Sequence, residues 1–222
     1  MNIKTTDLFD LEHTKAADYL RQYEYPWQAL AGIADFVEAY GRSLPQEEYD
    51  QIAENVWIAK DVVIYNKLSN YFKGPCVIGH RTEVRPGAFI RGSVLVGDDC
   101  VVGNSTELKN VILFDNVQVP HYNYVGDSIL GYKAHMGAGS ITSNVKSDKK
   151  NVVIHNNGEE YETGRKKIGG MIGDHVEVGC GSIINPGTVV GRCSNIYPLS
   201  SVRGCVPENS IYKNEGDIVV KK

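Results

Sequence analysis

The sequence lacks the features that define several common classes of protein. No apolar run approaches the roughly 18 residues that a transmembrane helix needs, and the first residues carry no apolar stretch of a secretory signal. No excess of positive charge is present either, because 23 Lys and Arg stand against 27 Asp and Glu, a net charge of −4. We therefore expect a cytoplasmic protein, with no membrane and no nucleic acid as its partner.

Cysteine is scarce and poorly spaced for cross-linking. The five cysteines form no Cys-x-x-Cys pair, and their number is odd: Cys76, Cys100, Cys180, Cys193 and Cys205. This pattern argues against a disulfide framework and against a zinc knuckle. We expect reduced thiols that fill small sites, and no bound metal.

Residues 1–50 predict a small helical segment. Pro26 suits the first position of a helix, and Gly41 is a plausible C-cap. A shorter helix is expected from Thr14 to Leu20. Between Pro26 and Gly41, apolar residues recur on one helical face: Trp27, Leu30, Ile33, Ala34 and Val37. Nothing here suggests chemistry, so the segment is interpreted as a packing or oligomerisation appendage.

Residues 51–222 follow a different rule, because apolar residues recur every sixth position in several runs that are separated by breaks in phase. A small residue often stands four places later, as Thr82 and Ala88 do after Ile78 and Val84. A period of six fits neither a helix nor an amphipathic strand; it predicts a hexapeptide solenoid, in which each hexad forms one side of a triangular coil. The apolar positions are Ile52, Ile58, Ile64, Ile78, Val84, Ile90, Val96, Val102, Leu108, Leu113, Val119, Val125, Leu130, Met136, Ile172, Val178, Ile184, Val190, Ile196 and Val202.

The longest interruption of this repeat covers residues 146–167. Its apolar residues alternate around Asn157-Gly158, which predicts a β-hairpin that projects from the solenoid.

A filled prism has no internal cavity, so a functional site must lie on its outer walls, in a loop, or between copies of the chain. The richest strip runs from residue 119 to residue 144 and contains His121. A neutral histidine can accept a proton near pH 7. The plain alternative is a surface histidine with no role, and Arg85 or Cys180 taken alone could equally be a solvated or a packing residue.

The combined pattern resembles a known family. The stretch from Pro120-His121 to Asp127, then Gly137-Ala138-Gly139-Ser140-Ile141-Thr142 and Asn144, is similar to the acetyltransferase domain of the bacterial bifunctional N-acetylglucosamine-1-phosphate uridyltransferase/glucosamine-1-phosphate acetyltransferase. The resemblance covers about residues 52–210. It implies a left-handed parallel β-helix, a homotrimer and sites between subunits, without the family's nucleotidyltransferase domain.

The resemblance also implies a function, namely transfer of acetyl from acetyl-CoA to an amino-sugar phosphate in UDP-N-acetylglucosamine biosynthesis. Glucosamine-1-phosphate or galactosamine-1-phosphate is the expected acceptor. His121 matches the general base. The implied substrate-binding residues are Arg85, Lys109, Tyr124, His135, Asn144 and Lys150, and the implied coenzyme-binding residues are Ala138, Cys180, Pro198 and Lys213.

Physical chemistry agrees with these roles. An ammonium group attacks a thioester only after a base has removed its proton. The oxyanion that forms needs a donor, for which a backbone N–H of the Gly137-Ala138-Gly139 turn is available. Cations such as Arg85 and Lys109 suit a phosphate. Either Asp127 or a backbone carbonyl is expected to orient His121.

The sequence departs from the family at several places, including Cys180, where the family has serine, and Pro198, where it has alanine. His135 stands where the family has asparagine, so the sugar can differ. The long loop makes the position of the phosphate-binding lysine ambiguous, because Lys149, Arg165, Lys166 or Lys167 could replace Lys150. Lys213 is the nearest candidate for a coenzyme-phosphate arginine, and its alignment is open.

Two other classes remain as alternatives. One is a non-catalytic assembly or regulatory module of a sugar-nucleotide pathway. The other is a zinc hydrolyase like the γ-class carbonic anhydrases, which needs two histidines five residues apart. No pair has that spacing among His13, His80, His121, His135, His155 and His175.

Overall fold

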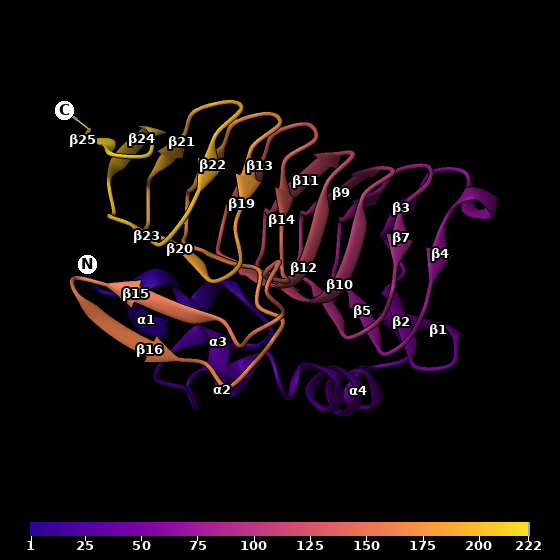
Figure 1. The fold of residues 1–222 in the computed structure, drawn as a ribbon. Helices are drawn as coiled ribbons and strands as arrows, with labels where there is room; N and C mark the ends of the chain where they lie inside the picture. Colours follow the sequence, from indigo (N-terminus) through magenta and orange to yellow (C-terminus); the bar gives the residue numbers. More distant parts are fainter. Residues whose placement is uncertain (222) are drawn as a thin grey trace.

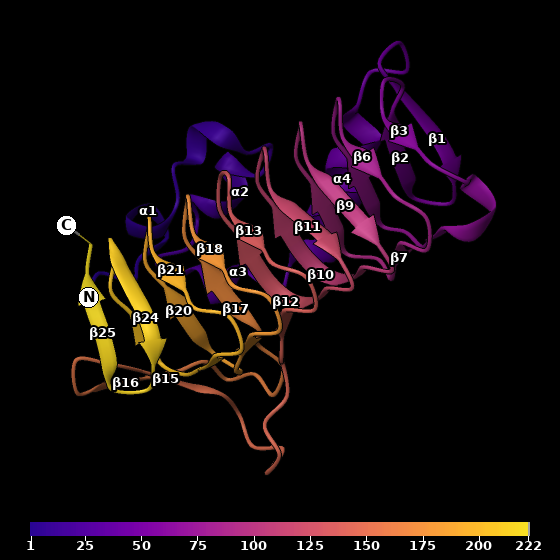
Figure 2. The same ribbon diagram turned by 90° about the horizontal axis from the view of Figure 1, so that it is seen from above.

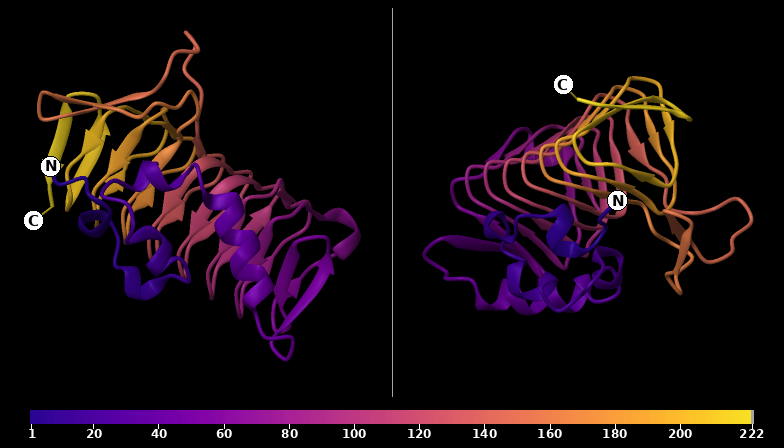
Figure 3. Two further views of the ribbon diagram at one scale, coloured as in Figure 1. Left: turned by 90° about the horizontal axis from the view of Figure 1, so that it is seen from below. Right: turned by 90° about the vertical axis from the view of Figure 1, so that its left-hand side faces the viewer.

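The computed structural model describes residues 1–221 as a long solenoid with helices along one side (Figure 1). Short strands stack from coil to coil in parallel, so that each coil satisfies the backbone groups of its neighbours. Seen along its length, the coil has a triangular outline (Figure 3). The structure confirms the predicted left-handed parallel β-helix.

The solenoid has three walls. Wall 1 is a nine-stranded sheet, which Figure 2 shows face-on. Its strands are β3 (Val63–Ile64), β6 (Glu83–Val84), β9 (Val101–Asn104), β11 (Gln118–His121), β13 (His135–Met136), β18 (Glu177–Val178), β21 (Asn195–Ile196), β24 (Ser210–Asn214) and β25 (Asp217–Val220).

Walls 2 and 3 are joined because β10 and β12 each run through the corner between them. Wall 2 holds β4 (Tyr71–Phe72), β7 (Phe89–Ile90), the start of β10 (Glu107–Leu113) and of β12 (Tyr124–Leu130), β14 (Ile141–Thr142), β19 (Ile183–Ile184) and β22 (Ser201–Val202). Wall 3 holds β1 (Tyr49–Ala53), β2 (Val56–Ala59), β5 (Cys76–Ile78), β8 (Val94–Val96), the ends of β10 and β12, β17 (Gly170–Ile172), β20 (Thr188–Val190) and β23 (Cys205–Val206).

The six-residue period sets the core. From Ile78 to Val202, every predicted apolar position is buried inside the prism, where each side chain adds about 1.5–3 kcal/mol of burial free energy. Small hydroxyl residues occupy the inner corners, and Thr82 Oγ1 donates to the carbonyl of Gly97 at 3.0 Å. The prediction is wrong for Ile52, which is 52% exposed, because β1 pairs with β2 in the antiparallel direction outside the repeat.

The N-terminal segment forms several short helices and lies along wall 3 (Figure 1). Pro26 opens a helix as predicted, but the helix from Pro26 is interrupted at Leu30–Gly32 and continues as a second one. Gly41 is not a C-cap. The helices are α1 (Thr5–Leu8), η1 (Leu11–His13), α2 (Ala17–Leu20), α3 (Pro26–Ala29) and α4 (Ile33–Ser43), and a further 3₁₀ turn, η2 (Lys67–Ser69), leaves the solenoid.

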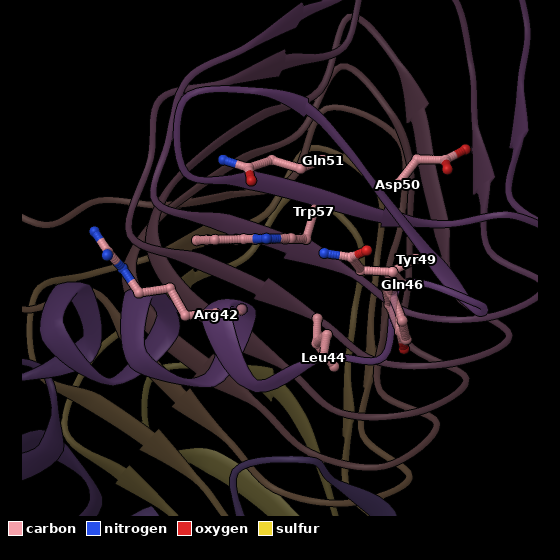
Figure 4. Close-up of a pocket in the computed structure, with 8 residues that line it drawn as sticks. Arg42, Leu44, Gln46, Tyr49, Asp50, Gln51 and Trp57 are labelled. Carbon is pink, nitrogen blue, oxygen red and sulfur yellow. The ribbon is translucent and has the colours of Figure 1, made fainter.

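Packing explains the glycine at position 41. A Cβ there would lie 2.1 Å from Cε3 of Trp57, so only glycine lets α4 rest on the indole. The cavity beside this contact measures about 430 Å³, and Figure 4 shows Trp57 between Arg42 and Gln51. Trp57 is only 7% exposed, and none of the predicted site residues lines this cavity. The cavity therefore lies at the packing interface between α4 and the β1–β2 pair.

A buried carboxylate fastens the N-terminal segment to the solenoid. Asp174 Oδ2 accepts from the backbone N–H of Asp10 at 2.6 Å, and Oδ1 accepts from that of Tyr132 at 2.8 Å. Burial raises the pKa of the Asp174 carboxyl above its ordinary value. Arg192 Nε lies 3.3 Å from the same group.

The loop at residues 146–167 leaves the corner between walls 2 and 3 and forms the predicted hairpin. Strands β15 (Val153–Asn156) and β16 (Glu159–Glu162) pair across Asn157 and Gly158, which both have positive φ. The hairpin then lies back along the N-terminal segment (Figure 3). The Tyr161 ring lies 5.3 Å from that of Tyr25, and the Met1 ammonium donates to Asn156 at 3.1 Å.

None of the helices found in residues 1–221 combines the length and the apolar character required to cross a bilayer. All five cysteines are free thiols, of which Cys76 and Cys100 are buried.

Candidate active site

Equivalent positions of successive coils form straight files, because parallel strands stack about 4.8 Å apart. One file follows the exposed corner between walls 1 and 2. His121 pairs with Asn104 of the preceding coil, and the carbonyls of His121, Ala138 and Cys180 accept the N–H groups of Gly139, Gly181 and Leu199 in turn. The structure therefore brings four predicted residues into one line, which we call the histidine file: His121, Ala138, Cys180 and Pro198.

A groove of about 290 Å³ runs beside the histidine file on wall 1. Its floor is backbone, because Gly137 and Gly179 occupy successive coils. A Cβ at Gly137 would lie 2.7 Å from the Cys180 nitrogen, and one at Gly179 would lie 2.4 Å from the Pro198 nitrogen. The lining residues are His135, Gly137, Glu177, Val178, Gly179, Cys180, Asn195, Ile196, Tyr197 and Pro198. The groove therefore joins three of the predicted residues, His135, Cys180 and Pro198.

His121 does not line the groove; it lies on the preceding coil, next to Ala138 in the histidine file. It ends β11, and Tyr122 turns the corner with φ +52°. The backbone N–H of His121 donates to Asn123 Oδ1 at 3.0 Å. The imidazole is exposed and makes no hydrogen bond within residues 1–221, so both ring nitrogens face solvent.

His135 differs from His121 in having a partner. Its Nδ1 lies 2.7 Å from Glu177 Oε2 on the next coil. This contact joins two successive coils of wall 1, and both residues line the groove.

A second group of predicted residues gathers at the corner between walls 2 and 3 around Asp127. This carboxylate is 1% exposed and accepts from Lys109 Nζ at 3.0 Å, from Asn110 Nδ2 at 2.9 Å and from Asn144 Nδ2 at 2.5 Å. Asn144 Nδ2 also donates to the Tyr124 hydroxyl at 3.0 Å, and burial raises the pKa of that hydroxyl. Asp127 thus holds Lys109 and Asn144 and does not contact His121.

The two predicted cations lie on different walls. Arg85 donates its backbone N–H to the Val102 carbonyl on wall 1, and its Nε lies 2.8 Å from Glu83 Oε1. Lys109 lies on wall 2. The structure does not bring Arg85 beside Lys109.

A different arginine lies beside Lys109, and the sequence reasoning missed it. Arg91 donates its backbone N–H to the Leu108 carbonyl at 2.8 Å, which makes it the neighbour of Lys109 on the preceding coil. Its Nη1 lies 2.7 Å from Glu107 Oε1. The available signal was the separation of 18 residues between Arg91 and Lys109, since three hexads return the chain to the same file.

The two remaining predicted lysines lie apart from both groups. Lys150 is exposed near the start of the inserted loop, where its backbone N–H donates to Asp148 at 3.0 Å. Lys213 lies on β24 beside Tyr197, because the Tyr197 N–H donates to the Tyr212 carbonyl. It therefore stands at the far end of the wall that carries the groove.

Within residues 1–221, no three His, Cys, Asp or Glu side chains lie close enough together to hold a metal ion.

Comparison with known proteins places the chain in a family. Residues 72–206 match the family model described as the GMPPB C-terminal domain. The chain is 30% identical to a bifunctional protein GlmU of Methanococcus maripaludis, over 99% of this chain and 53% of that protein. It is 27% identical to a bifunctional sugar-1-phosphate nucleotidylyltransferase/acetyltransferase of Sulfurisphaera tokodaii, over 95% of this chain and 55% of that protein. The chain spans about half the length of these curated relatives.

Among solved structures, similarity is weaker. A hexapeptide transferase family protein from Anaplasma phagocytophilum gives a TM-score of 0.40 at 13% identity, over 75% of this chain and 80% of that one. The acetyltransferase domain of PglB from Neisseria gonorrhoeae, solved with acetyl coenzyme A, gives 0.36 at 16% identity, over 71% and 53%.

Proposed function

Because this chain belongs to the family of the GMPPB C-terminal domain, with GlmU-type bifunctional proteins among its relatives, we propose that it is an acetyl-CoA-dependent N-acetyltransferase. The acceptor is an amino-sugar phosphate, with glucosamine-1-phosphate and galactosamine-1-phosphate as the first candidates. His121 acts as the general base, and no metal takes part.

The observation that supports this proposal best is the histidine file beside its glycine-floored groove. Three steps of about 4.8 Å separate His121 from Pro198, so the file is roughly 14 Å long. A file of this length beside a groove with a backbone floor at Gly137 and Gly179 suits an extended pantetheine arm, which needs a narrow track with few side chains. Cys180 and Pro198 would border the arm, and Lys213 lies further along the same wall, where a coenzyme phosphate would end.

His121 supplies the proton transfer. The acceptor ammonium gives a proton to the neutral imidazole, and its nitrogen lone pair then forms the N–C bond to the thioester carbon. The adduct carries an oxyanion and a protonated nitrogen, and this nitrogen gives up its second proton to solvent. When the oxyanion collapses, the C–S bond breaks, and the thiolate takes the proton from the imidazolium and leaves as coenzyme A thiol. An exposed ring without a protein partner is able to make both transfers.

The oxyanion has one available backbone donor in the predicted turn. The N–H groups of Gly137 and Gly139 already donate to the carbonyls of Val178 and His121. No acceptor within residues 1–221 is found for the N–H of Ala138, and Ala138 is exposed in the histidine file. This N–H is therefore assigned to the oxyanion.

The Asp127 group supplies the acceptor site. Lys109 and Arg91 provide adjacent positive charges on wall 2 for a phosphate. Tyr124 and Asn144 offer a hydroxyl and an amide to the sugar. Tyr124 lies only three residues after His121, so the sugar would bridge the two corners with its amine toward the imidazole.

The proposal includes assembly of three copies. On the outside of wall 2, Tyr71 and Phe89 are 55% and 41% exposed, and their rings lie 5.3 Å apart. Exposed aromatic pairs of this kind are typical of protein contacts. Analytical ultracentrifugation tests this part, and a monomer would contradict it.

The test is release of coenzyme A thiol from acetyl-CoA against a panel of amino-sugar phosphates. We expect turnover with one member, and a loss of about 10²–10⁴-fold in kcat for His121→Asn. His155→Asn, an exposed histidine of the hairpin, is the matched control. Undiminished turnover by His121→Asn would remove the histidine from the mechanism, and failure to bind acetyl-CoA or any sugar phosphate would favour the assembly module.

A further inference from the structure

A cavity of about 600 Å³ lies at the corner between walls 2 and 3, next to Lys109. Three parts of the chain that are distant in sequence form it: the junction of α3 and α4, the solenoid corner, and the end of the inserted loop. The lining residues are Leu30, Ala31, Ala34, Ser93, Lys109, Asn110, Asp127, Arg165, Lys166 and Lys167. We call it the basic cavity.

The charge balance of this cavity is strongly positive. Four cationic side chains face one carboxylate, and that carboxylate is already bound to Lys109 at 3.0 Å. Arg165, Lys166 and Lys167 form no ion pair within residues 1–221. Like charges held together without counter-charge favour an anionic ligand.

Arg165 gives a second, independent indication. Its Nε is buried and has no hydrogen-bond acceptor within residues 1–221. Buried donors are nearly always satisfied, because leaving one unpaired loses the hydrogen bond that water would otherwise provide. A guanidinium in this state is suited to a phosphate oxygen, to which it can donate from two N–H groups.

Hydrogen bonds connect the three segments of the chain that form the basic cavity. Asn110 Nδ2 donates both to Asp127 and, at 3.2 Å, to the Leu30 carbonyl of the N-terminal segment. The Asp127 carbonyl accepts the N–H of Gly169, two residues after the basic run, at 2.7 Å. Asp127 thus fixes both the helical segment and the loop end around Lys109.

We propose that the basic cavity binds the phosphate or diphosphate group of the acceptor sugar. The N-terminal segment and the end of the inserted loop are then parts of the substrate site and not packing appendages. This inference rests on the proposed function in one respect, namely that the acceptor lies against Lys109. A sugar 1-phosphate and a nucleoside diphosphate sugar are the two sources to compare.

The binding test needs no turnover. Calorimetry with pyrophosphate on the full chain should show binding to the wild type and at least a tenfold loss in the triple variant Arg165→Gln, Lys166→Gln, Lys167→Gln. The matched control neutralises three exposed lysines on other faces, Lys60, Lys67 and Lys133. Equal affinity of the wild type and the triple variant, or no binding by the wild type, would overturn the proposal.

A second pair of variants tests whether the N-terminal segment takes part in anion binding. Ala31→Glu places a carboxylate in the basic cavity, whereas Ala39→Glu places one on an exposed position of α4 outside it. We expect only Ala31→Glu to weaken pyrophosphate binding. Equal behaviour of the two variants would show that the helical segment takes no part.

Kinetics identifies the source of the phosphate. The triple variant should raise the KM of the acceptor at least tenfold and leave the KM of acetyl-CoA unchanged. The acceptor with the larger loss, sugar 1-phosphate or nucleoside diphosphate sugar, is the one that occupies the cavity. A raised KM for acetyl-CoA alone would assign the site to the coenzyme and overturn the proposal. If no acceptor is acetylated at all, the proposed function fails, and the calorimetric result still decides whether the cavity binds anions.

Discussion

Lys109 Nζ lies 3.0 Å from Asp127 Oδ2, and the carboxylate in this pair is almost completely buried. Asp127 also has φ +49°, a conformation that asparagine tolerates. Asp127→Asn therefore keeps the turn and removes the ion pair. We expect the free energy of unfolding in urea to fall by about 1–3 kcal/mol.

An exposed pair provides the control for this change. Asp99 also has positive φ and lies 2.7 Å from Arg81 in a solvated position. Since exposed ion pairs add little stability, Asp99→Asn should be nearly neutral. Equal losses in the two variants would show that burial of Asp127 has no special effect.

We expect substitution of Arg91 to weaken acceptor binding and substitution of Arg85 to leave it nearly unchanged. Arg91 is the neighbour of Lys109, whereas Arg85 lies on wall 1 beside Glu83. Loss of a charge-assisted hydrogen bond costs about 1.5–3 kcal/mol, so Arg91→Gln should raise the KM of the acceptor by about tenfold or more. Arg85→Gln should change it little. The reverse outcome in the thiol-release assay would move the phosphate to wall 1.

The backbone of wall 1 leaves no room for a side chain at Gly103. A Cβ there would lie 1.6 Å from the Pro120 carbonyl oxygen. Gly103→Ala must therefore push two coils apart, at a cost of about 1–3 kcal/mol or more.

Gly204 gives the comparison, because its φ is +71° and a Cβ at this position would meet no atom within 4 Å. Gly204→Ala should cost only the left-handed strain of roughly 1–2 kcal/mol. Thermal unfolding of both variants measures the difference, and a smaller loss for Gly103→Ala would contradict the close approach.

Buried tyrosines predict a loss of stability at high pH. Burial raises the pKa of the Tyr49 hydroxyl above its usual value of about 10. Folding then favours the protonated hydroxyl, so this contribution is present below about pH 10 and is lost as the pH rises toward the folded pKa. Urea unfolding between about pH 8 and pH 11 should show the decline.

Tyr49→Phe is the variant that tests the assignment. The phenyl ring keeps the packing and cannot ionise, so the decline above about pH 10 should be smaller than in the wild type. An unchanged slope would assign the effect to other groups.

Most of the solenoid is predictable from the sequence because its core is local. Each hexad places its own apolar residue inward, so positions from Ile78 to Val202 follow from spacing alone. Ile52 fails because an antiparallel partner, which spacing does not reveal, replaces the repeat there. The expectation of a helix end at Gly41 is also wrong, because this position needs glycine for packing against Trp57. A contact between segments distant in sequence cannot be read from local spacing.

The site is predictable only in part. The histidine file follows from the resemblance, and the stacking of its members is a property of the coil. The partnership of Arg91 and Lys109 is also within reach, given their spacing of one coil. The convergence of Leu30 and Arg165 is not, because tertiary packing of a loop and a helical segment brings them together.

The stacking of coils has a consequence for how such a molecule can change. Separations along the histidine file are whole multiples of about 4.8 Å, so the reach between the imidazole and the far end of the groove can lengthen or shorten only by gain or loss of a complete turn. Within a wall, a sequence change of any other length would turn outward-facing residues into the interior, whereas extra residues at a corner can leave the solenoid as a loop, as residues 146–167 do. Adaptation to a longer or shorter donor is therefore expected to occur by gain or loss of whole coils, while the retained coils keep their functional residues in place.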